Sequence, residues 1–93
     1  MKKNILLDMS ATLIHHGHIR LIKKASKFGN VIIALTKDKE IKKYKGYTPE
    51  IKFRNRKEIL QSFKHVHRVV PCNFIITDKF LKNLNIDFLV HGN

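Results

Sequence analysis

The chain has 93 residues, of which 43% are hydrophobic, so it can form one small domain and is too apolar for a disordered segment. It carries 19 lysines and arginines against 7 acidic residues, and the formal net charge of +12 indicates an anionic partner such as a nucleotide, a nucleic acid or a membrane surface. Cys72 is the only cysteine, which excludes an internal disulfide and favours a cytoplasmic protein. No apolar run approaches the ~20 residues of a membrane helix, so no membrane partner is expected.

The beginning of the chain predicts a strand, a polar turn and a helix. Residues 4–8 are predicted to form the first strand because they contain an unbroken apolar run. After the turn, apolar residues recur at helical spacing, at Leu21, Ile22, Ala25 and Phe28. The helix is therefore expected to reach about Phe28 and to stop at Gly29 and Asn30, since glycine and asparagine are common at helix C-termini.

The rest of the chain continues the alternation. Strands are predicted at residues 31–36, 66–70 and 88–90, the first buried on both faces and the second closed by Pro71. Helices are predicted at residues 38–43, 55–63 and 77–84, with a loop at 44–53 between the first two. The first of these helices is expected to have Asp38 near its N-cap, and the other two are expected to be capped by Asn55 and Thr77.

Strands that alternate with helices predict an α/β fold, a Rossmann-like parallel sheet with helices on both faces. Residues 1–93 form a single domain in this interpretation. The chain stops directly after the last predicted strand, whereas a complete doubly wound domain continues. We therefore expect the domain to be truncated at its C-terminus.

The sequence His-His-Gly-His at residues 15–18 lies in the turn between the first strand and the first helix. Ligands of open α/β sheets bind beyond the carboxyl ends of the strands, and a helix N-terminus favours phosphate. His15 and His18 are three residues apart, so they can point the same way, and Gly17 would let a bulky anion approach the backbone. The turn is therefore a predicted phosphate site.

This His-x-Gly-His arrangement after a first strand resembles the signature of the nucleotidyltransferase superfamily that includes the cytidylyltransferases. Further matches follow in order: an acid at Asp38, a lysine loop at Lys45 followed by Arg56, a strand end at Val69-Val70-Pro71, and His91-Gly92-Asn93. The closest resemblance is to glycerol-3-phosphate cytidylyltransferase-type domains and to those associated with phosphoenolpyruvate mutase. Many family members have Gly-Thr-Phe-Asp where this chain has Met9-Ser10-Ala11-Thr12, and the form Met-Ser-Ala-Asp resembles the domains associated with phosphoenolpyruvate mutase. Thr12, Arg54 and Asn93 depart from the pattern, because the family has an acid at each position.

The resemblance implies transfer of CMP from CTP to a small phosphorylated or phosphonate acceptor, with release of pyrophosphate and with Mg²⁺ bound to the triphosphate. It implies catalytic roles for His15, His18 and Lys45. It also implies nucleotide binding by Met9, Ser10, Ala11, Gly17, Arg56, Gly92 and Asn93. No metal site made by the protein is expected, because the other histidines form no zinc-ligand spacing with Cys72.

The chemistry of the reaction explains these residue types. Histidines can donate hydrogen bonds to oxygens whose charge grows in the transition state, a lysine can screen phosphates as a point charge, and an arginine can hold a phosphate bidentately. His16 is interpreted as a spacer and His91 as a support for its loop.

Other functions remain open at this point. An adenylyltransferase of the same superfamily would have the same turn, and a truncated or degenerate domain would fold without activity. A basic nucleic-acid-binding module would explain the charge, but the chain lacks the interleaved aromatic and basic residues of stacking platforms, so nucleic acid is an unlikely partner. The family's tendency to dimerise makes a homodimer an expectation as well.

Overall fold

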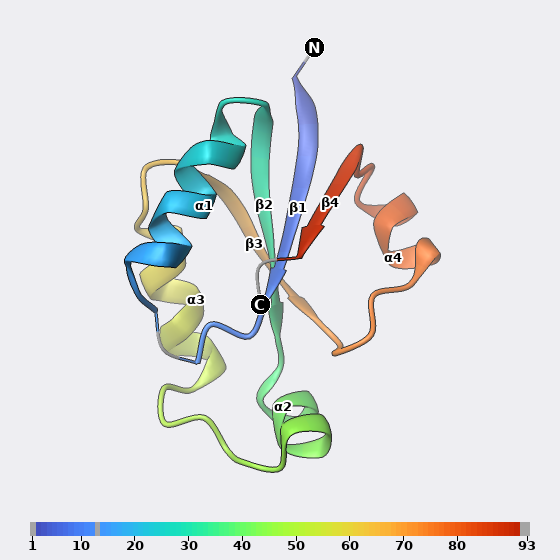
Figure 1. Ribbon diagram of the computed structural model, residues 1–93. Coiled ribbons are helices and arrows are strands. Elements are labelled where there is room, and N and C mark those ends of the chain that lie inside the picture. Colours follow the sequence, from blue (N-terminus) through green and yellow to red (C-terminus); the bar gives the residue numbers. More distant parts are fainter. Residues whose placement is uncertain (1, 13, 92–93) are drawn as a thin grey trace.

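The computed structural model describes residues 2–12 and 14–91. These residues form a parallel sheet in the order β3-β2-β1-β4 (Figure 1). The strands are β1 (Lys3–Met9), β2 (Gly29–Thr36), β3 (Val66–Cys72) and β4 (Phe88–His91). The helices are α1 (His16–Ser26), α2 (Asp38–Lys45), α3 (Phe53–Gln61) and α4 (Asp78–Asn83). The Rossmann-like parallel sheet expected from the sequence is confirmed.

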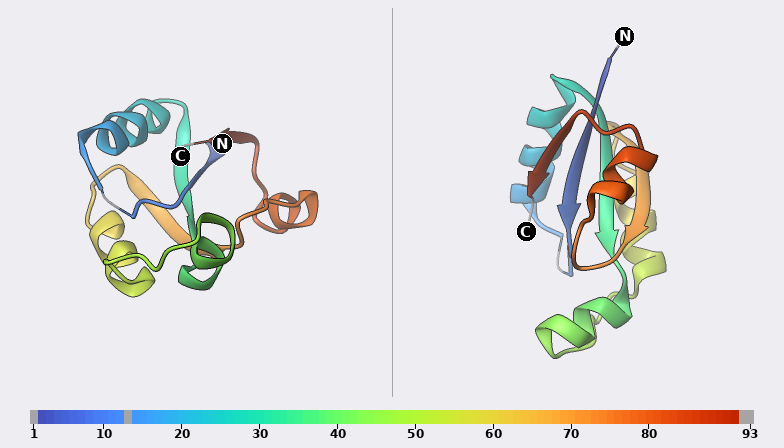
Figure 2. Two further views of the ribbon diagram at one scale, coloured as in Figure 1. Left: turned by 60° about the horizontal axis from the view of Figure 1, so that its bottom comes forward. Right: turned by 90° about the vertical axis from the view of Figure 1, so that its right-hand side faces the viewer.

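The helices cover both faces of the sheet. Figures 1 and 2 show α1 and α3 on one face and α4 on the other. Because side chains alternate along a strand, Ile5 and Leu7 of β1 pack toward α1 and α3, whereas Leu6 belongs to the cluster beside α4. The central strand β2 is buried at every position from residue 31 to 36, as its apolar sequence predicts.

The end of α1 differs from the prediction. The helix ends at Ser26, and Gly29 and Asn30 are the first residues of β2 rather than a helix stop. A Cβ atom on Gly29 would lie 2.1 Å from the carbonyl oxygen of Lys3, so glycine allows β2 to pair closely with the start of β1. Phe28 lies outside the helix and is 68% exposed, so it is not part of the buried helix face.

The start of α3 also differs from the prediction. The helix begins at Phe53, with Lys52 at the N-cap, instead of being capped by Asn55. The backbone N–H of Phe53 donates to both carboxylate oxygens of Asp38, at 3.1 Å each. Asp38 is itself the first residue of α2, whose N-cap is Lys37. The cap of α3 therefore comes from a different element, where no local sequence signal can reveal it.

Two other boundaries have simple causes. Pro71 lies inside β3, which continues to Cys72, and β3 tolerates it because this strand lies at the edge of the described sheet. The helix α2 runs to Lys45, two residues beyond the prediction, and ends at Gly46 in the left-handed conformation. The predicted cap of α4 is confirmed, because the Thr77 hydroxyl accepts the backbone N–H of Phe80 at 3.2 Å.

This topology determines where a ligand can bind. The chain moves from β1 outward through β2 to β3 and then returns to place β4 on the other side of β1. The carboxyl ends of β1 and β4 therefore meet at the switch point, where open α/β sheets bind ligands. The helix α2 lies beyond this edge of the sheet (Figure 1). None of the helices in the described ranges has the length and apolar character needed to cross a membrane.

Candidate active site

A cleft of about 490 Å³ opens at the carboxyl ends of the strands. Each strand contributes to its wall, through residues such as Asp8 of β1, Thr36 of β2, Cys72 of β3 and His91 of β4. Three of the residues predicted to act on the nucleotide also line it: Met9, Ser10 and Lys45. The cleft lies at the edge where the sheet topology places a ligand.

The two histidines at the start of α1 cap the helix reciprocally. His15 is the N-cap, and its Nδ1 atom accepts the backbone N–H of Gly17 at 3.0 Å. In return, Nδ1 of His18 accepts the backbone N–H of His15 at 3.2 Å. This is a capping box in which imidazoles replace the usual hydroxyl and carboxylate. Because each Nδ1 is an acceptor, the proton of each neutral ring lies on Nε2, which is a hydrogen-bond donor.

The two rings lie against each other, as their spacing predicts. Their centroids are 4.3 Å apart, with His18 buried and His15 exposed. The structure gives a more specific explanation for glycine at position 17 than the predicted approach of an anion. A Cβ atom at this position would lie 2.6 Å from Cε1 of His15, so glycine makes room for the capping imidazole.

The segment that leads from β1 into this turn is buried and strained. Ser10 and Ala11 are 8% and 3% exposed, and Ala11 has a φ of +49°, in the left-handed region. That conformation costs a residue with a Cβ atom about 1–2 kcal/mol. The surrounding contacts hold it in place, because the carbonyl of Met9 accepts the Thr36 hydroxyl at 3.3 Å and the carbonyl of Ser10 accepts a hydrogen bond from Arg56.

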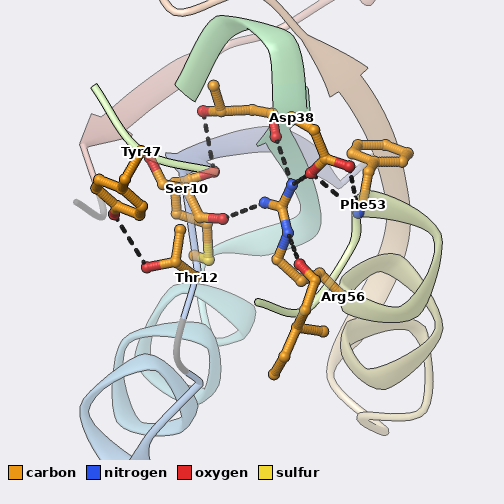
Figure 3. A network of polar contacts seen from close by, with 9 residues as sticks. Ser10, Thr12, Asp38, Tyr47, Phe53 and Arg56 are labelled. Atoms are coloured by element: carbon orange, nitrogen blue, oxygen red, sulfur yellow. Dashed lines mark hydrogen bonds and ion pairs between the residues drawn. The ribbon is translucent and has the colours of Figure 1, made fainter. Parts of the chain in front are cut away.

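Arg56 is the centre of this polar network (Figure 3). Its side chain is fully buried. Nη1 donates to the carbonyl of Ser10, while Nη2 donates to the carbonyl of Thr36 at 3.1 Å and to Asp38 at 2.5 Å. Nε donates to the carbonyl of Ile51 at 3.0 Å. One side chain of α3 thus holds the ends of β1 and β2 and the start of α2 together.

This arrangement favours a positioning role for Arg56. The guanidinium does not line the cleft, and its described hydrogen bonds all go to protein oxygens. The direct phosphate contact predicted from the sequence is not seen in this conformation and stays a prediction. Lys45, in contrast, is exposed at the end of α2 and lines the cleft, where a ligand can reach it.

A second polar pair was missed by sequence reasoning. Asp8 and His91 are register partners in the β1–β4 pair, and Nδ1 of His91 lies 2.9 and 3.0 Å from the two carboxylate oxygens of Asp8. Both residues line the cleft. In the sequence, the only signal is that β1 and β4 each have a polar residue at or near the end. That these two residues form a pair can be inferred only once the strand order is known. Gly92 and Asn93, predicted to bind the nucleotide, lie outside the described residues.

The remaining chemistry of the cleft concerns Cys72. Burial raises the pKa of its thiol to about 11, against a lowering influence from its hydrogen bond with Thr36. The thiol is therefore protonated at neutral pH and a poor nucleophile. Among residues 2–12 and 14–91, no group of three or more His, Cys, Asp or Glu side chains could hold a metal ion.

The fold is Rossmann-like, and the histidine turn follows β1 at the end of the sheet where the switch point lies. A family model described as cytidylyltransferase-like matches residues 10–93, and the chain belongs to this family. It is 35% identical over 83 residues to the ethanolamine-phosphate cytidylyltransferase of Mus musculus, covering 87% of this chain and 20% of that protein. It is 33% identical over 72 residues to the glycerol-3-phosphate cytidylyltransferase of Staphylococcus aureus, covering 74% and 52%.

A solved structure supports the fold independently of the sequence. The lipopolysaccharide core biosynthesis protein from Thermoplasma volcanium superposes with a TM-score of 0.83 at 18% identity, over 96% of this chain and 73% of that one. The chain thus spans about a fifth of the length of the ethanolamine-phosphate cytidylyltransferase and about half of the length of the glycerol-3-phosphate cytidylyltransferase. The cytidylyltransferase resemblance inferred from the sequence is confirmed at the level of the family.

Proposed function

We propose that this chain carries a nucleotidyl-transfer site, which passes CMP from CTP to a small phosphomonoester or phosphonate in the cytoplasm. The observation that carries the proposal is the reciprocal cap of His15 and His18. It makes Nε2 the protonated nitrogen of both neighbouring rings, at the helix N-terminus beside the switch point. Each ring then carries an Nε2–H group, and phosphate oxygens accept hydrogen bonds from such donors.

In the proposed reaction, an oxygen of the acceptor phosphate attacks the α-phosphorus of CTP. The new P–O bond forms as the bond to the bridging oxygen breaks, and that electron pair leaves with pyrophosphate. The ionised acceptor needs no base, and no covalent enzyme intermediate forms. His15 and His18 donate to the α-phosphate oxygens, whose charge grows in the transition state. Lys45, from the cleft wall, screens the repulsion between the two anions.

The substrate is proposed to be CTP with Mg²⁺, which offsets part of the triphosphate charge. The described residues provide no cluster of three metal-binding side chains, so the ion is expected to be held by phosphate oxygens and water. The acceptor class follows from the relatives, whose names specify ethanolamine phosphate and glycerol 3-phosphate. Both are small phosphomonoesters, which suits a cleft of about 490 Å³ that also holds part of a nucleotide.

The test is a titration of the ¹⁵N-labelled chain with CTP and, separately, ATP, followed through backbone amide and imidazole resonances. We expect saturable shifts at residues 10–19 with CTP and weaker ones with ATP. Stronger binding of ATP at the same residues would favour the adenylyltransferase alternative. Shifts limited to lysines on the outer faces of α2 and α4 would overturn the proposed site.

A further inference from the structure

A second cleft, of about 420 Å³, lies at the amino ends of the strands, at the opposite end of the sheet from the first cleft. It forms where the amino ends of β2 and β3 meet the carboxyl end of α1, at the top of Figure 1. Its polar lining consists of Lys2, Ser26, Lys27, Asn30, Lys64, His65 and His67. Among the described residues that line it, none is an aspartate or a glutamate.

The three lysines of this cleft come from separate segments. Lys2 precedes β1, Lys27 follows α1 and Lys64 precedes β3. Lys27 has an ordinary explanation, because cations are favourable beside the carbonyl end of a helix. That explanation does not extend to Lys2 and Lys64, and none of the three takes part in the ion pairs found among the described residues. Three lysines from separate segments therefore line one concavity, and the ion pairs of the described residues give none of them a carboxylate partner.

An irregularity of the sheet places a histidine at the same cleft. In the pairing of β2 with β3, Val31 lies opposite Val66 and Ile32 lies opposite Arg68. His67 is thus the extra residue of a β-bulge. Bulges change the direction of side chains and are treated as conserved features of a fold rather than defects. His67 is exposed and His65 is half-buried, so two imidazoles join the three lysines at this edge.

We propose that this cleft binds a small polyphosphate anion of two or three linked phosphates. A concave surface with one sign of charge focuses the field and raises the local concentration of its counter-ion. Three lysines can offset most of the charge of a diphosphate or triphosphate, and lysine binds phosphate as a point charge. A nucleic acid would favour aromatic rings for stacking, and the lining residues include no Phe, Tyr or Trp. The proposal rests on this cleft alone and is independent of the proposed transferase function.

The experiment measures binding of inorganic pyrophosphate and of tripolyphosphate to the ¹⁵N-labelled chain at 150 mM salt. We expect saturable amide shifts at Lys27, Lys64 and His67. Replacing both exposed lysines, as Lys27→Gln with Lys64→Gln, should weaken this binding by about tenfold, because each exposed charge contributes modestly. The matched control is Lys79→Gln with Lys82→Gln on α4, which removes the same charge from another surface and should change affinity less than twofold.

Pyrophosphate is also the product released at the proposed transferase site, so the positions of the shifts separate the two sites. Shifts only at residues 10–19 would overturn the second site and leave the transferase proposal intact. Equal losses in the two double variants would show diffuse attraction to a basic surface and would also overturn it. Tighter binding of single-stranded RNA or of phosphatidylserine vesicles through the same lysines would replace the small anion with a macromolecular partner.

Discussion

A carboxylate oxygen of Asp38 lies 2.5 Å from Nη2 of Arg56, and the same carboxylate caps α3 through the backbone N–H of Phe53. Asp38 therefore does two things at once: it neutralises a fully buried guanidinium and starts the helix that carries it. Because Arg56 also holds the carbonyls of Ser10 and Thr36, this pair connects the cleft wall to α3.

Arg56→Met should destabilise the chain strongly. The change leaves Asp38 without its partner and buried carbonyls without a donor, and removing one member of a buried ion pair typically costs about 3–5 kcal/mol. Asp38 is 32% exposed, so the loss should fall toward the lower end of that range. Urea unfolding measures it. The control is Arg54→Met, an exposed arginine on the same helix, expected to change stability by less than about 0.5 kcal/mol. Similar losses in both variants would contradict the role given to Arg56.

Gly17→Ala should separate stability from the geometry of the site. Alanine improves helix propensity by about 1 kcal/mol, but the new Cβ displaces the ring of His15 and loses a cap worth about 1 kcal/mol. The free energy of unfolding should therefore change little, while the imidazole ¹⁵N resonances of His15 shift as Nδ1 loses its backbone donor. Unchanged His15 resonances would show that the ring does not depend on the glycine.

The sequence predicted the elements whose signals are local. The apolar run of β2, the Thr77 cap and the histidine turn all depend on neighbouring residues, and each was found where it was expected. The start of α3 was missed because its cap, Asp38, lies 15 residues away from Phe53. Local patterns cannot report a hydrogen bond between two elements.

The same reasoning explains which features of the site the sequence did not reveal. Arginine is usually a surface residue, so the complete burial of Arg56 could not be inferred from its position in the chain. Asp8 and His91 are 83 residues apart and meet only because β4 pairs with β1. Their pairing depends on strand order, which the sequence pattern left unspecified.

The titration of Cys72 should make stability depend on pH only in alkaline solution. The thiol has a pKa of about 11 in the folded chain and about 9 when it is unfolded. Between these values the folded chain holds more protons, so the free energy of unfolding falls as pH rises, by at most about 1.4 kcal/mol per pH unit. Below pH 9 this contribution is constant. Urea unfolding at pH 8, 9.5 and 10.5, compared with Cys72→Ala, isolates it from the lysines and tyrosines. A difference between the two proteins that does not change with pH would disprove it.

The final prediction concerns the donor at His18. His18→Ala removes an Nε2–H group that the proposed reaction uses as charge grows on the α-phosphate, and loss of one such donor costs on the order of 10²–10³ in rate. The variant also loses the bond from the backbone N–H of His15, which should lower stability by about 1 kcal/mol. Because the interaction strengthens in the transition state, kcat should fall much more than the affinity for CTP. Pyrophosphate release with CTP and glycerol 3-phosphate or ethanolamine phosphate measures kcat, and amide shifts measure affinity.

His16→Ala, at the exposed neighbouring histidine, is the matched control and should retain both the turnover and the affinity for CTP. Unchanged turnover in His18→Ala, with only a higher KM, would assign His18 to the structure of the helix N-terminus rather than to the reaction.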